Sequence, residues 1–195
     1  ANELREAIEA PANLIGLKFE EGLVNALLQD ILGEPAALPL LQFTLLKLWE
    51  SRKRNRVTWE AYKRLGGGRQ ALAKTADDFY NNLIPEEQVT AKRILLKLVR
   101  PGEGLEVTSN RLRRSQLYYK AEAGYIIDNV LDKFFRARLL RFTEGDSQDD
   151  AQIEVAHEAL IRNWPRLVAW LEDERAELRQ RQRLTTAAEQ WQRLG

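Results

Sequence analysis

The sequence has no cysteine, no methionine and only one histidine among its 195 residues. Without cysteine the chain has no disulfide framework and no thiolate metal site, which agrees with a reducing cytoplasm. No apolar run approaches the roughly 20 residues that span a bilayer, and the N-terminus has no signal-peptide pattern. We therefore expect a cytoplasmic protein without a membrane partner. The start ANELREAIEAP, without an initiator methionine, predicts a piece of a longer protein.

An excess of charge of one sign is also missing. Lysine and arginine number 30 against 29 acidic residues, so no global field draws the chain onto nucleic acid or an anionic membrane. The length suits one large domain or two small ones and is enough to bury a core.

Helical periodicity dominates the first part of the chain. We predict helices over residues 2–10, over 19–32 and over the segment ALPLLQFTLLKLWESRK. The third is apolar on most of its circumference, and Pro39 suits its first position. We expect Leu45 and Trp49 of this helix in the core. Its polar positions are mainly Gln42, Thr44 and Lys47.

A short helix over VTWEAYKRL follows, with Thr58 as its N-cap, and the run Gly66, Gly67, Gly68 ends it. We place a domain boundary there, so that residues 1–68 form a small helical domain. LGGGRQ lacks the Lys-Ser/Thr pair of a phosphate-binding loop, so the glycines predict a hinge or helix stop.

The second part mixes helices and strands. Pro85 begins a helix whose apolar face contains Ala91, Ile94, Leu95 and Leu98. GLEVTSNRL predicts a strand, RSQLYY a short helix, and AGYIIDNVLDKFFRARL a longer helix with Ile127, Val130, Leu131 and Phe134 inward. RLLRFTEG and AQIEVAHE predict a hairpin around the loop GDSQDD. This order of elements is that of a winged helix over residues 69–160, with a β-hairpin wing, followed by helices over 161–195. Their apolar stripe includes Leu178, Leu184, Ala188 and Trp191. The predicted fold class is mainly α.

Catalytic and metal sites are not expected. Glu158, Glu172, Asp173 and Glu174 have no histidine or cysteine partner other than His157, and acids on a charged helix are usually a solvated face. The spacing supports neither a Ser-His-Asp set nor a pair of catalytic carboxylates.

Several segments resemble a known family: LREAIEAPA, FEEGLVNALLQDI, LPLLQFTLLKLWE, ALAKTADDFY and above all VAHEALIRNWPRLVAWLEDER. They are similar to the region between the ATPase domain and the WD-repeat propeller of large bacterial STAND proteins, the signal-transduction ATPases with numerous domains. The resemblance covers about Leu4 to Trp191. It implies a helical and winged-helix pair that clasps ADP together with a P-loop domain. ADP or ATP is then expected only in the full-length protein, and none in this sequence.

The same resemblance suggests a role for the single histidine. The family carries an apolar-His-Asp motif whose histidine bonds the β-phosphate of ADP, and Ala156, His157 and Glu158 stand at that motif, with Glu in place of Asp. An imidazole N–H is a directional donor to a phosphate oxygen. His157 is therefore the candidate nucleotide sensor. The structural alternative is that its side chain caps the following helix or bonds a backbone carbonyl.

Pro39 is the second residue that the resemblance implicates. The family has a Gly-x-Pro motif whose proline packs on adenine, and Ala37, Leu38, Pro39 retain the proline but have alanine for glycine. Pro39 is equally suited to be a plain helix start.

Three functions remain open. The resemblance implies coupling of nucleotide state to conformation and signalling, with a P-loop domain and a downstream WD-repeat sensor as intramolecular partners, and oligomerisation on activation. A DNA-binding winged helix is the first alternative, based on Arg111, Arg113, Arg114, Lys120, Arg138 and Arg141. Against it, the predicted outward face of the longer helix contains Asp128, Asn129, Asp132, Lys133 and Arg136, so we expect no nucleic-acid partner. A helical adaptor that ignores nucleotide is the second alternative.

Overall fold

The computed structural model describes residues 2–34, 37–101, 107–119, 123–143, 152–177 and 180. Its helices are α1 (Asn2–Leu14), α2 (Leu23–Ile31), α3 (Ala37–Glu50), α4 (Trp59–Leu65), α5 (Gly67–Asn81), α6 (Pro85–Leu98), the 3-10 helix η1 (Arg114–Leu117), α7 (Gly124–Arg136) and α8 (Glu158–Asn163). Residues 165–177 are also helical. The strands are β1 (Lys18–Phe19), β2 (Arg56–Val57), β3 (Val99–Pro101), β4 (Val107–Ser109), β5 (Leu112–Arg113), β6 (Leu140–Thr143) and β7 (Gln152–Val155).

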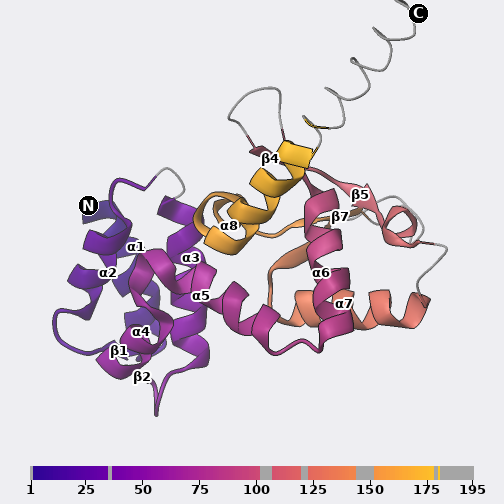
Figure 1. Cartoon of the computed structure of the whole chain (residues 1–195). Helices are drawn as coiled ribbons and strands as arrows, with labels where there is room; N and C mark the ends of the chain where they lie inside the picture. Colours follow the sequence, from indigo (N-terminus) through magenta and orange to yellow (C-terminus); the bar gives the residue numbers. More distant parts are fainter. Residues whose placement is uncertain are drawn as a thin grey trace, which may run out of the picture.

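The chain is mainly helical, as its periodicity predicted. Figure 1 shows α1 to α5 gathered on one side of the molecule and α6, α7 and the largest sheet on the other, with α8 between the two groups. None of the helices in the described ranges is both long and apolar enough to cross a bilayer.

The first two helices differ in extent from the prediction. α1 continues through Pro11 to Leu14, because Ile8 and Ala12 are buried on either side of the proline. α2 begins only at Leu23, because the preceding Lys18–Phe19 pairs in parallel with β2. Gly22, with φ +77°, makes the turn between this strand and the helix, a conformation that favours glycine.

Helix α3 contributes to the core, but its buried face differs from expectation. Leu45 and Trp49 are only partly buried and pack against the edge of the core. Thr44, one of the polar positions, is fully buried, because its hydroxyl lies 2.8 Å from the carbonyl oxygen of Leu40 and 3.2 Å from that of Gly68. A polar side chain therefore helps to join α3 to α5.

The glycine run joins α4 to α5. The Thr58 hydroxyl accepts from the Ala61 N–H at 3.2 Å, which confirms the predicted N-cap. Gly66, with φ +86°, caps α4 after Leu65, so the predicted helix stop is confirmed, whereas Gly67 and Gly68 are already the first residues of α5.

The Asp30 carboxylate explains why α5 begins inside this run. It accepts from the Gly68 N–H at 3.0 Å and from the Tyr62 hydroxyl, so the first turn of α5 is held against α2 and α4. The domain boundary at residue 68 stays a prediction.

The predicted hairpin of the second part is confirmed. β6 and β7 pair antiparallel, from Leu140 opposite Val155 to Thr143 opposite Gln152, and the sheet order is β5-β7-β6. The loop GDSQDD falls outside the described residues. GLEVTSNRL contributes two short strands rather than one, since β4 pairs with β3 and β5 with β7.

Two hydrophobic clusters share α3. Leu41 and Leu48 belong to the smaller cluster, with α1, α2 and α4, whereas Leu40 and Phe43 belong to the larger one, with α5 to α8 and the three-stranded sheet. Trp164, which follows α8, is fully buried in the larger cluster, and its indole N–H donates to Asp77 of α5 at 2.9 Å. The predicted stripe from Leu178 to Trp191 lies outside the described residues.

The inward face of α7 is confirmed, because Ile127, Val130, Leu131 and Phe134 are all buried. Its predicted outward positions are exposed or partly exposed, but three of them have partners on neighbouring elements.

Lys133 and Asn129 both bond the buried Glu87 carboxylate of α6, with N···O distances of 2.6 Å. Asp128 accepts from Arg114 and Tyr118. The neighbouring elements α6 and η1 supply partners on this side, so α7 is covered more widely than its apolar stripe indicates.

Candidate functional site

His157 lies in the turn between β7 and α8. The β6–β7 ladder fixes the residues before it, and the Ala156 N–H donates to the Leu139 carbonyl at 2.9 Å. The carbonyl of His157 accepts from the Leu160 N–H, also at 2.9 Å, so the backbone of His157 starts α8. The position of the histidine is therefore set by main-chain bonds on both sides.

The imidazole of His157 is partly buried and packs edge-on against Phe43 of α3, with ring centroids 5.1 Å apart and an interplanar angle of 75°. It does not cap α8, and within the described part of the chain it has no hydrogen-bond partner. Among the described residues, the side chain therefore neither caps α8 nor bonds a backbone carbonyl. Its ring nitrogens keep their hydrogen-bonding capacity.

Burial lowers the pKa of His157 below its usual 6.5, and the positive charge of Arg141 lowers it further. The imidazole is thus favoured in its neutral form, with one N–H donor and one acceptor. A phosphate placed beside it would act in the opposite direction and favour the cation.

Pro39 is the third residue of α3 rather than the first, and it is exposed. It lies four residues before Phe43, so the two share a helix face about 6 Å apart along the axis. The structure thus brings the helix of Pro39 to His157 through Phe43.

A charged cluster on the neighbouring strands was not predicted. Glu154 of β7 is buried and accepts from Arg111 at 2.5 Å and from Arg141 at 2.7 Å. Burial alone would raise the pKa of Glu154, but the bonds and charges of the two arginines outweigh it and lower that pKa. Arg141 stands opposite Glu154 in the β6–β7 ladder, whereas Arg111 comes from just before β5, so the alternation along β7 alone gave no sign of this cluster.

The arginines of the DNA-binding alternative are largely committed within the chain. Arg111 and Arg141 bond Glu154, Arg114 bonds Asp128, and Arg138 lies 3.7 Å from Glu50 of α3. Lys120 falls outside the described residues. Paired guanidinium groups are less free to contact phosphates.

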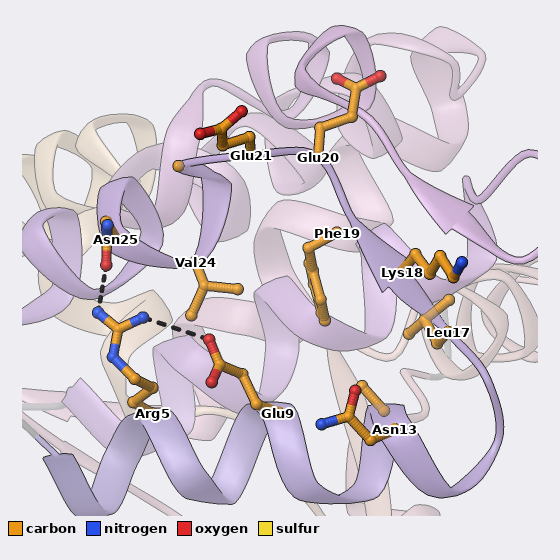
Figure 2. A pocket seen from close by; sticks show the side chains of 12 residues that line it. Arg5, Glu9, Asn13, Leu17, Lys18, Phe19, Glu20, Glu21, Val24 and Asn25 are labelled. Atoms are coloured by element: carbon orange, nitrogen blue, oxygen red, sulfur yellow. Dashed lines mark hydrogen bonds and ion pairs between the residues drawn. The ribbon is translucent and has the colours of Figure 1, made fainter.

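A separate pocket of about 390 Å³ lies between α1, β1 and the start of α2, and Figure 2 shows its lining. Phe19 and Val24 form an apolar part, and Arg5 is held by Glu9 at 3.2 Å and by Asn25. The pocket also contains Glu20 and Glu21, so its acids outnumber its bases. Such a lining repels phosphate, and His157 is not part of it.

The described residues contain no group of three or more histidine, cysteine or acidic side chains suited to hold a metal ion. The His157 imidazole forms a packing contact between the turn before α8 and helix α3. Comparison with protein families gives the context of that contact: the family model of Novel STAND NTPase 1 matches residues 1–195.

The chain belongs to the Novel STAND NTPase 1 family. No match was found among curated proteins or among solved structures. In this chain the His157 imidazole contacts Phe43 of α3, and the Glu154 cluster lies on the adjacent strand.

Proposed function

We propose that this chain is a regulatory helical and winged-helix module of a STAND NTPase. In this proposal it couples the ADP or ATP state of a P-loop domain, contributed by a segment outside this sequence, to a change of conformation that signals. Membership of the Novel STAND NTPase 1 family supports an NTPase context. The absence of a Lys-Ser/Thr pair after the glycines of LGGGRQ supports a phosphate-binding loop located elsewhere.

One observation carries the proposal: the His157 imidazole lies against the helix of Pro39 and has no hydrogen-bond partner within the described residues. A nucleotide in this region would meet a histidine donor and a proline-bearing helix together. A bond between imidazole and phosphate contributes about 1.5–3 kcal/mol when charge-assisted. Because the bond exists only while the module is closed on the nucleotide, ADP would stabilise the closed form by that amount.

The order of elements supports the winged-helix part of the proposal. Helix α6, strands β3 to β5, the short η1, helix α7 and the β6–β7 hairpin follow one another, and the sheet order β5-β7-β6 brings the last strand between the other two. In this reading α7 occupies the position of the recognition helix. Lys133 of α7 bonds Glu87, and the nearby Arg114 bonds Asp128, so these basic groups are already paired within the chain. This favours docking of α7 against protein over DNA binding.

Release of a fluorescent ADP analogue from the full-length protein tests the function. His157→Ala removes the proposed contact, so we expect the closed state to lose about 1.5–3 kcal/mol and ADP to leave roughly 10- to 150-fold faster. Arg162→Ala, an exposed change on α8, is the matched control and should leave release unchanged. In the 195-residue chain alone, His157→Ala should cost only the edge-on contact with Phe43, about 0.5–1.5 kcal/mol, because the proposed phosphate contact is not made there.

Two results would refute the proposal. One is unchanged ADP release in His157→Ala together with a marked loss of thermal stability in the 195-residue chain, which would make the histidine structural. The other is tight nucleotide binding or turnover by the 195-residue chain itself. A sequence-selective gel shift at physiological salt would instead favour the DNA-binding alternative.

A further inference from the structure

A second pocket lies where α6 faces Tyr119 and the helix over residues 165–177. Its volume is about 320 Å³, at the lower end of the range of small-molecule sites. It shares no residue with the surroundings of His157. Lys92, Arg93 and Lys97 of α6 supply its positive charge, and among the described lining residues Glu174 is the one acid.

The lysines of this pocket are held by aromatic rings. The Lys97 ammonium lies 4.0 Å from the centroid of Tyr119, and that of Lys92 lies 5.5 Å from the centroid of Trp170. Neither lysine has a carboxylate partner among the residues that the structure describes, although Glu174 lines the same pocket. Lys97 donates to the Gln116 carbonyl at 2.7 Å, which leaves two of its three donors for another acceptor.

The apolar part of the pocket is exposed. Val89 is 66% exposed and Tyr119 is 36% exposed, and Leu96 lies between the lysines along α6. An apolar surface next to ammonium groups that still have unused donors is suited to a ligand with an apolar body and an anionic group.

We propose that this pocket binds a small organic anion. Its carboxylate or phosphate contacts Lys92 and Lys97, and its apolar body packs against Tyr119 and Val89. The binding does not depend on nucleotide or on His157.

Titration of the 195-residue chain, followed by backbone amide NMR at constant ionic strength, tests the proposal. Benzoate and phenyl phosphate are the probes, benzyl alcohol is the neutral counterpart, and inorganic phosphate is the anion without an apolar body. We expect the aromatic anions to shift the amides of Leu96 and Tyr119 in a saturable way. Benzyl alcohol should bind about tenfold more weakly, because it loses both lysine charge contacts at up to about fivefold each. Inorganic phosphate should also bind more weakly, because it has no apolar body to pack against the pocket. The stronger of the two aromatic anions identifies the preferred acid group.

Lys92→Gln combined with Lys97→Gln should weaken binding of the better probe about tenfold, since each exposed charge contact contributes up to about fivefold. Lys63→Gln, an exposed change on α4, is the control and should leave binding unchanged. If the double variant fails to fold, Lys92→Gln alone should weaken binding up to about fivefold, because Lys92 has no hydrogen bond to lose within the described residues. Equal shifts from benzyl alcohol or from inorganic phosphate, or unchanged affinity in the lysine variants, would overturn the proposal.

Discussion

Gly67→Ala tests how the start of α5 is held. Gly67 has φ +81°, and a Cβ added there would lie 2.7 Å from the Asp30 carboxylate oxygen. The left-handed backbone alone costs alanine about 1–2 kcal/mol. The clash also displaces Asp30 from the Gly68 N–H and the Tyr62 hydroxyl, and loss of bonds to a charged group costs about 1.5–3 kcal/mol. We therefore expect Gly67→Ala to lower the free energy of unfolding by about 3–5 kcal/mol.

Gly33→Ala is the matched control for this variant. Gly33 has φ +93°, but nothing lies within 4 Å of an added Cβ, so only the backbone cost of about 1–2 kcal/mol applies. The change in unfolded-chain entropy is the same for both substitutions and cancels in the comparison. Urea unfolding followed by tryptophan fluorescence measures both. Equal losses, or an undiminished cost of Gly67→Ala in an Asp30→Ala background, would show that the carboxylate does not set this junction.

Two further predictions concern tryptophan and histidine. Trp164→Ala should lower the free energy of unfolding by about 3–5 kcal/mol because Trp164 is fully buried, and Trp49→Ala by only about 1–2 kcal/mol because Trp49 lies at the edge of the core. Equal losses in urea unfolding would contradict this ranking. For His157, burial and then Arg141 lower the folded-state pKa, so the unfolded chain takes up a proton first, and stability should fall as pH drops below about 6.5. His157→Gln should flatten the pH dependence of the melting temperature between about pH 7.5 and about 5, and an unchanged slope would exclude this contribution.

The elements that the sequence predicted correctly are those with a strong local pattern. The apolar spacing of α6 and α7 and the turn residues between β6 and β7 gave these elements and their inward faces. The Thr58 N-cap was also predicted correctly, because it depends only on Thr58 and on Ala61 three residues later. These features depend on residues a few positions apart, which a sequence displays directly.

Contacts between distant segments were the part that could not be predicted. The contact between the Phe43 ring and His157 joins α3 to the turn before α8. The apolar pattern of α3 does not indicate this contact, and neither does the sequence around His157. Periodicity likewise identified the apolar face of α7 but could not indicate that α6 places Glu87 beside Lys133. Side-chain partners of this kind follow from tertiary packing.

The position of α5 has a consequence for hydrogen exchange. Its first turn packs on Ile31 of the smaller cluster, and its later residues Ala71, Leu72 and Ala76 belong to the larger one. Opening either cluster alone leaves the helix held by the other, so amides in the middle of α5 should exchange with deuterium only when both clusters open. Those amides would then report the global unfolding free energy of the chain, whereas amides of helices that pack in one cluster alone would exchange whenever that cluster opens.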